Sequence, residues 1–356
     1  SVSMCRRIFK EQTSESGDIP FYKIGTFGGQ ADAFISKELF EEYKEKYPYP
    51  QKGDILISAS GSIGRTVEFT GKSEYFQDSN IVWLNHGDGL CNSFLKYFYE
   101  IVKWAGIEGS TIKRLYNDNI LNTAIRLPSV EEQEQIGAFF RHLDLLITLH
   151  QCKYSRLCNI KKSMLEKMFP KEGASVPEIR FAGFTDAWEQ RKTKDICVIG
   201  TGKSNTQDQI EDGEYPFYIR SDVPVRSNKY LYDCEAVITI GDGNIGKVFH
   251  YVDGKFDLHQ RCYKMTDFQD IWGKYFFHFF STKFYDRAMK MTAKATVDSV
   301  RLEMISEMDI QKPPQTAEQK KIAAFFDSLD HLITLHQREL ERLQNIKKAC
   351  LEKMFV

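Results

Sequence analysis

The feature that most restricts how this chain can fold is an internal duplication. Residues 128–169 align without a gap to residues 314–355, at a constant offset of 186, and 26 of the 42 aligned residues are identical. Three runs recur unchanged, namely LITLHQ, NIKK and LEKMF. A match of this length does not arise by chance, and a repeat of this kind decides the architecture before any other signal is weighed.

Each copy of the repeat is predicted to be one long helix. After the first turns neither copy holds a proline, and the only glycine is Gly137. Ser129 with Glu132, and Thr316 with Gln319, have the spacing of a helix capping box. At 1.5 Å per residue, each helix would be about 60 Å long.

A seven-residue period runs through both copies and predicts that the two helices pair as a coiled coil. One seam holds Ile136, Leu143, His150, Leu157 and Met164 in the first copy, and Ile322, Leu329, His336, Leu343 and Cys350 in the second. A second seam holds Phe139, Leu146, Ile160, Phe325, Leu332 and Ile346.

A globular region, here called a head, precedes each helix. The two heads share G-D-I-P-F-Y with G-E-Y-P-F-Y, and G-S-I-G-R (residues 61–65) with G-N-I-G-K (residues 243–247). Alternating runs at 54–60 and 236–242 lead into the glycine pairs, which predicts strand, tight turn and strand. Helical patterns follow near 93–104 and 271–284, so we expect α/β (α+β) heads with short strands.

The repeat predicts four segments: a first head at 1–128, a first helix at 129–170, a second head at 171–312 and a second helix at 313–356. Pro170 ends the first helix, and a short polar linker follows it. The second head opens with RFAGFTDAWEQRKTKDI (residues 180–196), which has no counterpart in the first. We therefore expect a first head that is shortened or lacks its N-terminal segment.

Charge does not predict a nucleic-acid-binding surface. Residues 1–128 carry 15 basic and 16 acidic side chains, and residues 170–312 carry 20 and 22. A DNA-binding face would have to come from local clustering or be shared with a basic partner. No stretch has the roughly 20 apolar residues of a membrane span. Eight scattered cysteines without a C-x-x-C pair indicate free thiols in a reducing cytoplasm, and neither disulfides nor zinc.

The sequence contains no motif of an enzyme. The Asn-Pro-Pro or Asp-Pro-Pro turn that would hold a flipped adenine is absent, as are a Walker loop and an H-E-x-x-H metal motif. The glycine-rich residues 200–204 are too short for a phosphate loop and fit better as a polar loop that carries Lys203, Ser204 and Asn205 toward DNA. We expect a non-catalytic chain with no bound metal or cofactor.

These features together resemble the specificity subunit of type I restriction–modification enzymes. The resemblance rests on F-x-x-x-W-E-Q-R (Phe184 to Arg191), on the two G-x-I-G turns, and on E-Q-x-x-I-(G/A)-A-F-F-x-x-L-D at 132–144 and 318–330. It covers nearly the whole chain, and its helix motif occurs twice.

The resemblance implies two target recognition domains, each of which reads half of a split, asymmetric site in double-stranded DNA. An antiparallel coiled coil with a pseudo-twofold axis would separate them and act as a ruler. Two adenine methyltransferase subunits, which use S-adenosylmethionine, would bind the chain. Two translocating nuclease subunits, which use ATP and Mg²⁺, would join them. A pseudo-twofold suits duplex DNA, because both heads can then meet the groove in the same way.

Base contacts are expected from polar and basic residues in the loops of the heads. The candidates in the first head are Lys23, Ser62, Arg65, Asn80, Lys113 and Arg114. Those in the second head are Lys203, Asn205, Arg220, Asn244, Lys247, His259, Gln260 and Arg261. The paired glycines are expected to shape the turns without touching DNA.

The middle of the predicted coiled coil is polar. The two helices have their midpoints near residues 149 and 335, so an antiparallel pair would bring His150 and Gln151 close to His336 and Gln337. Such a polar pair fixes register at some cost in stability, and two protonated imidazoles would repel each other in acid.

Two other functions remain open at this point. The near-neutral heads also suit a coiled-coil scaffold whose heads bind proteins. A stand-alone methyltransferase or nuclease is disfavoured by the absent motifs. A DNA mobility shift in the presence of methyltransferase subunits, and a methyl-transfer assay on the isolated chain, discriminate among the three.

Overall fold

A computed structural model describes residues 1–105, 114–292 and 299–355. The chain divides into two compact units, and each combines one head with parts of both long helices. The first unit comprises residues 1–151 and 338–356, and the second comprises residues 152–337.

The long helices that the duplication predicts are present. Helix α4 spans Val130–Lys167 and helix α8 spans Thr316–Met354. The backbone N–H of Glu132 donates to Ser129 Oγ (3.3 Å), so the first predicted cap forms. The second is wrong, because α8 already includes Thr316 and the side chain of Gln319 turns toward the second head.

The first head is a mixed α/β structure with two small sheets. One has the strand order β1-β7-β4-β5 and the other β3-β2-β6, in which β2 and β6 are parallel. The strands are β1 (Val2–Met4), β2 (Ile19–Tyr22), β3 (Phe34–Ile35), β4 (Ile55–Ser58), β5 (Thr66–Glu68), β6 (Tyr75–Phe76) and β7 (Ile81–Leu84). The helices are η1 (Lys10–Gln12), α1 (Lys37–Lys46), α2 (Asn92–Ile101) and α3 (Asn117–Leu121).

The second head holds a six-stranded sheet in the order β11-β10-β13-β12-β14-β9 and a separate β15-β8 pair. Its strands are β8 (Glu189–Lys192), β9 (Val198–Thr201), β10 (Tyr215–Tyr218), β11 (Val225–Ser227), β12 (Tyr232–Ile240), β13 (Phe249–Leu258), β14 (Cys262–Thr266) and β15 (Asp309–Lys312). Its helices are α5 (Thr193–Ile196), η2 (Thr206–Asp208), α6 (Gly273–Thr292) and α7 (Leu302–Ser306).

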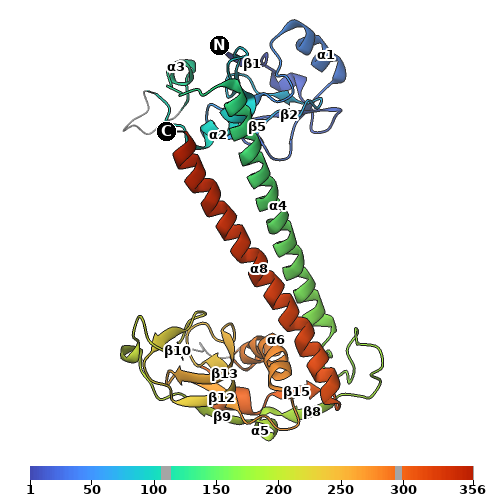
Figure 1. The fold of residues 1–356 in the computed structure, drawn as a ribbon. Helices are drawn as coiled ribbons and strands as arrows, with labels where there is room; N and C mark the ends of the chain where they lie inside the picture. Colours follow the sequence, from blue (N-terminus) through green and yellow to red (C-terminus); the bar gives the residue numbers. More distant parts are fainter. Residues whose placement is uncertain (106–113, 293–298, 356) are drawn as a thin grey trace. The chain divides into compact units, whose positions relative to one another are not determined.

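The two heads share one topology. The order β1-β7-β4-β5 matches β9-β14-β12-β13, and β6-β2-β3 matches the end of β13 followed by β10 and β11. The long strand β13 therefore occupies the positions of both β5 and β6 in the sheet order. The parallel pairings agree as well, since Tyr22 faces Phe76 and Tyr218 faces Leu258. Strand, glycine turn and strand stand where the sequence predicts them in both heads. Figure 1 labels the two strands of the second head, β12 and β13.

The repeated E-Q motif attaches each head to the start of its own long helix. Gln133 is fully buried, accepts the N–H of Cys91 at 2.9 Å, and donates to the carbonyls of Gly89 and Pro128. Gln319 is also fully buried and does the same with the N–H of Trp272 and the carbonyls of Asp270 and Pro313. Each buried amide thus satisfies one N–H and one carbonyl just before α2 or α6, and a second carbonyl just before its own long helix.

The end of each long helix packs into the head at which the other helix begins. In the first unit, Phe355 lies against Phe94 and Phe140. In the second unit, Phe169 lies against Tyr275 and Phe326, the equivalents of Phe94 and Phe140. The start of one helix therefore lies beside the end of the other within each unit, so the two helices run antiparallel there.

Reciprocal ion pairs repeat the same antiparallel contact. Lys347 contacts Asp144 at 2.8 Å in the first unit, and Lys161 contacts Asp330 in the second. Both partners in one pair lie 186 residues from their counterparts in the other. Each α/β head is thus packed on an antiparallel pair of segments from the two long helices, in agreement with the predicted fold class of two heads and an antiparallel coiled coil.

The second predicted seam is wrong at several positions. Phe139, Leu146, Leu332 and Ile346 are exposed, whereas Phe140 and Phe326 are fully buried. Near the ends of the helices the inward direction is set by the heads, because Phe140 packs on Tyr97 of α2. A heptad assumes that the other helix is the only partner.

Candidate nucleic-acid interface

The same backbone frame holds the glycine turn in both heads. In the first head Ala59 donates to the carbonyl of Asn80 (2.7 Å) and accepts from the N–H of Leu115 (2.7 Å). In the second head Gly241 donates to the carbonyl of Arg261 (2.7 Å) and accepts from Val300 (2.6 Å). These bonds make Ser60 equivalent to Asp242, and Asn80 equivalent to Arg261.

Glycine is required in these turns by the backbone. Gly61 and Gly64 have φ of +64° and +78°, and Gly243 and Gly246 have φ of +81° and +67°. Only glycine adopts such angles without steric cost. Each turn carries the residues between its glycines past the end of β4 or β12.

The second head gathers two of its predicted residues on one carboxylate. Arg261 Nη1 lies 2.7 Å from Asp242 Oδ2, and Arg220 Nη1 lies 3.2 Å from both Asp242 oxygens. The side chain of Asp242 is 13% exposed, against 46% for Arg220 and 63% for Arg261. Burial alone would raise the pKa of Asp242, but hydrogen bonds from Arg261 and Arg220 and their charges lower it below its usual value.

Three further predicted residues adjoin this cluster. His259 is buried, and its Nδ1 accepts the backbone N–H of Arg261 at 3.1 Å. Burial and the nearby Arg220 lower the pKa of His259 below 6.5, and the imidazole ring of His259 is therefore mainly neutral at pH 7. Gln260 Nε2 donates to Asn205 Oδ1 at 2.6 Å. Five of the eight candidates in the second head therefore lie in one connected group.

The other candidates of the second head lie in its loops. Lys203, Asn244 and Lys247 are exposed, and Lys247 Nζ lies over the Tyr285 ring at 5.7 Å. The idea that the loop at 200–204 carries Ser204 toward DNA is wrong, since Ser204 is buried and donates to Asp257 at 2.7 Å. Gly202 is glycine because a Cβ there would overlap the Leu258 carbonyl.

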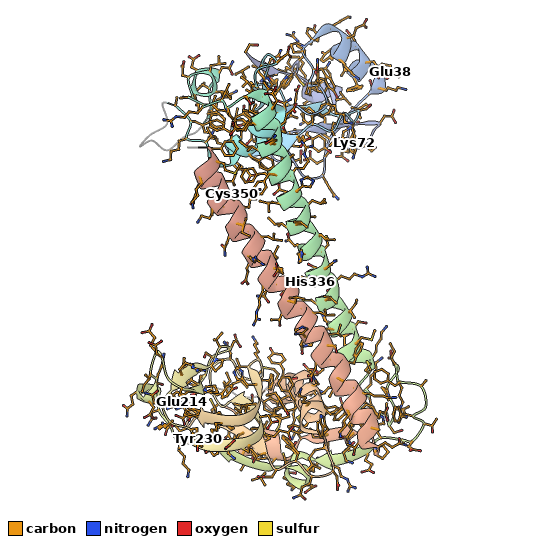
Figure 2. All side chains as sticks on the ribbon, in the orientation of Figure 1. Glu38, Lys72, Glu214, Tyr230, His336 and Cys350 are labelled. Carbon is orange, nitrogen blue, oxygen red and sulfur yellow. The ribbon has the colours of Figure 1, made fainter. Side chains whose placement is uncertain are left out.

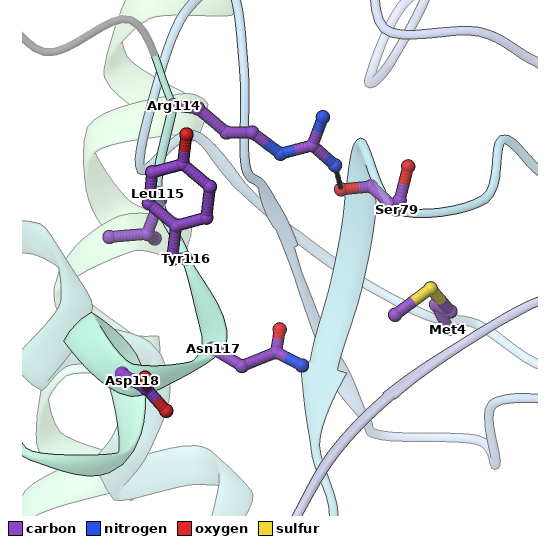
Figure 3. A pocket seen from close by; sticks show the side chains of 7 residues that line it. All are labelled: Met4, Ser79, Arg114, Leu115, Tyr116, Asn117 and Asp118. Atoms are coloured by element: carbon purple, nitrogen blue, oxygen red, sulfur yellow. Dashed lines mark hydrogen bonds between the residues drawn. The ribbon is translucent and has the colours of Figure 1, made fainter.

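The first head places a weaker, neutral pair in the same frame. Ser60 Oγ donates to Asn80 Oδ1 at 2.8 Å. Arg114 donates to the Ser79 carbonyl at 2.7 Å, across a pocket that Met4, Tyr116, Asn117 and Asp118 also line (Figure 3). Ser79 has a positive φ of 45°, which a serine rarely adopts, so Arg114 holds a strained turn beside Asn80.

The remaining candidates of the first head are less concentrated. Arg65 donates to the Gly28 carbonyl at 3.2 Å, and the Ser62 carbonyl accepts from Ser58 Oγ within the glycine turn. Lys23 pairs with Asp32 at 2.8 Å. Lys113 lies outside the described residues.

The predicted polar centre of the coiled coil falls on two different units. His150 and Gln151 lie on α4 in the first unit, whereas His336 and Gln337 lie on α8 in the second. Figure 2 labels His336. Their proximity stays a prediction.

Sequence reasoning missed Asp242, which organises the cluster of the second head. It also missed Ser60, which occupies the equivalent position in the first. Both residues directly precede the first glycine of a G-x-I-G turn, so an alignment of the two turns would have singled out this variable position.

Other kinds of site are not found in the part of the chain that is described. Among those residues no helix is long and apolar enough to cross a membrane, and no three His, Cys, Asp or Glu side chains are grouped to hold a metal ion. All eight cysteines are free thiols.

The sequence matches a model of the type I restriction modification DNA specificity domain over residues 1–158 and again over 185–345. A type I restriction enzyme specificity subunit of Haemophilus influenzae, S.HindORF215P, is 62% identical over 146 residues, which are 41% of this chain and 38% of that subunit. The MjaVIII specificity subunit of Methanocaldococcus jannaschii is 24% identical over 84% of this chain and 74% of its own length.

A solved structure has the same fold. The type I restriction–modification S subunit from M. genitalium matches with a TM-score of 0.69 at 14% identity, over 100% of this chain and 93% of that one.

The chain belongs to the type I restriction–modification DNA specificity family, since the family model covers most of its length in two matches. It has the make-up of a specificity subunit with two target recognition domains, and the two heads are those domains.

Proposed function

We propose that this chain reads a bipartite, asymmetric DNA site, with one half of the site assigned to each head. The observation that carries the proposal is the shared frame of the heads, which displays Ser60 and Asn80 in one and Asp242 and Arg261 in the other. Equal backbones with unequal polar side chains suit two readers of related geometry and different sequence. The antiparallel helices would set the distance between the half-sites.

The chemistry would belong to partner subunits. Two adenine methyltransferase subunits with S-adenosylmethionine, and two translocating nuclease subunits with ATP and Mg²⁺, would use this chain as their DNA-reading subunit in the cytoplasm. Exposed leucines on the long helices support a protein partner: Leu145 and Leu149 in the first unit, and Leu332 and Leu335 in the second. Isolated apolar side chains need no explanation, but repeated ones on one helix favour an interface.

The test is a mobility shift with the methyltransferase subunits present, followed by sequencing of methylated adenines in cells that carry the whole system. We expect a split motif with one methylated adenine in each half. Exchange of residues 178–312 for another head of the family should change one half alone. Binding without sequence preference would favour the protein-binding scaffold, and methyl transfer by the purified chain alone would contradict a non-catalytic role.

The ruler is tested by deletion within residues 141–160. Removal of four residues shortens a helix by about 6 Å and turns it by about 40° beyond a full turn. The unread gap between the half-sites should change, or binding should be lost. An unchanged site bound at full affinity would refute the ruler.

A further inference from the structure

The carboxylate of Asp242 organises a site that stability alone does not explain. Two arginines from different loops converge on it, and both are exposed, Arg220 at 46% and Arg261 at 63%. Exposed ion pairs contribute little to folding, because water competes for both charges and salt screens them. The cluster therefore contributes more to what the two arginines can bind than to the stability of the fold.

Both guanidiniums keep donors for a ligand. In the described structure each contacts Asp242 through Nη1. A guanidinium carries five N–H donors in a planar fork, so Nε and Nη2 are not used in these contacts with Asp242 and can donate to a ligand. Asp242 fixes the side-chain conformation beforehand, and an arginine that is ordered in advance loses less freedom on binding.

The chemistry of the cluster fits a base edge better than a phosphate. A phosphate beside Asp242 would meet a negative carboxylate, whereas the major-groove edge of guanine offers two acceptors, N7 and O6, spaced for one arginine fork. The backbone N–H of Arg261 is tied to His259 Nδ1, which further restricts where the side chain of Arg261 can reach.

The first head shows that this chemistry is not required by the fold. The positions of Asp242 and Arg261 are taken there by Ser60 and Asn80, which make one neutral hydrogen bond. The residue two after Tyr22, equivalent to Arg220, is the apolar Ile24. The arginine cluster is therefore a property of the second head alone.

From this arrangement we infer that Arg261 reads a guanine in the half-site of the second head. Asp242 positions the side chain of Arg261, and Arg220 supports Asp242. The inference rests on the proposed function, because it assumes that the heads contact DNA. Beyond that function, it specifies which base is read, which residue reads it and in which half-site the base lies.

The experiment uses the complex assembled with its methyltransferase subunits and a pool of duplexes with randomised sequence, from which bound duplexes are selected and sequenced. The wild-type complex should enrich a split motif with a fixed guanine in one half. Arg261→Ala and Arg261→Lys should both relax that one position, since lysine keeps the charge but not the fork. Asp242→Asn should relax it partly.

A modified base then tests the contact directly. Replacement of that guanine by 7-deazaguanine removes the N7 acceptor and leaves base pairing intact. Wild-type affinity should fall about 10-fold, while the affinity of Arg261→Ala should not change further. Lys194→Ala is the matched control, because Lys194 forms an exposed ion pair with Glu307 away from the cluster. It should leave the motif unchanged.

The outcomes separate the two claims. An enriched split motif that Arg261→Ala and Arg261→Lys leave intact would overturn the guanine contact and keep the proposed function. Equal sensitivity of wild type and Arg261→Ala to 7-deazaguanine would also overturn it. No enriched sequence at all would overturn both. Thermal unfolding of each variant verifies that the second head remains folded.

Discussion

Ala59 in the first head and Gly241 in the second make the same two backbone hydrogen bonds, yet the next residue differs in kind. It is Ser60 in one and Asp242 in the other, and the partner across the turn is Asn80 or Arg261. The frame is kept by bonds that any residue can make, so the displayed side chains are free to change. Variation can therefore alter what a head reads without altering how it folds.

The junctions between heads and helices behave in the opposite way. Gln133 and Gln319 bind three backbone groups each, and the reciprocal lysine–aspartate pairs are identical in both copies. A residue held by backbone groups on two elements cannot change alone. This difference fits the identity of the two copies at the junctions and their divergence at the turns.

Substitution of two equivalent glutamates should give the largest difference in stability loss between the two copies of the repeat. Glu318 is buried and receives two hydrogen bonds from Arg180, at 2.6 and 2.8 Å, whereas Glu132 is exposed. Glu318→Ala would leave a largely buried guanidinium without its partner and should cost about 3 kcal/mol of unfolding free energy. Glu132→Ala should cost less than about 0.5 kcal/mol. Urea denaturation measures both, and equal losses would show that the two junctions do not differ.

The shared glutamines should instead give matched losses. Gln133→Ala and Gln319→Ala each strand one buried N–H and two carbonyls, at a cost of about 2 kcal/mol in each unit. Denaturation followed by tryptophan fluorescence can compare the two. Gln135→Ala, on an exposed position of α4, is the control and should have little effect. A loss confined to one variant would argue against equivalent junctions.

Acid should weaken the second head through two histidines. Burial lowers the pKa of His250, and burial together with Arg220 lowers the pKa of His259. The unfolded chain then binds more protons than the folded one, so stability falls as the pH drops below the ordinary histidine value of 6.5. His259→Gln should reduce the slope of stability against pH between 6.5 and lower values. An unchanged slope would mean that His259 does not titrate with unfolding.

The smallest expected difference in stability is between variants of the two reciprocal lysines, Lys347 and Lys161. Lys347 is 17% exposed and contacts both Asp144 and Glu100, each at 2.8 Å, whereas Lys161 is 28% exposed and contacts Asp330. Lys347→Met should cost about 1 kcal/mol and Lys161→Met about half of that. Thermal unfolding at low and high salt measures both, and the difference should shrink as salt screens the pairs. A larger loss for Lys161→Met would reverse the comparison.

The architecture could be predicted because it depends on local patterns. The gapless repeat, the seven-residue period and the G-x-I-G turns can each be read directly from the order of residues in the sequence. The cluster around Asp242 could not be predicted, because its members lie at 220, 242 and 261 and meet only through the strand pairing of β10, β12, β13 and β14. The heptad pattern predicts a buried Phe139 and not the buried Phe140 for a related reason, because it carries no information about packing against α2.

The order of synthesis has a consequence for the first unit. Its core includes Leu351 and Phe355, which pack with Phe94 and Phe140. A ribosome that has finished residue 151 must still make residues 152–337 before the remaining part of this unit begins to appear. At about 5 to 20 residues per second, that interval lasts roughly 10 to 40 s. Throughout that interval the apolar surface of the first head that Leu351 and Phe355 cover in the complete unit lacks this cover.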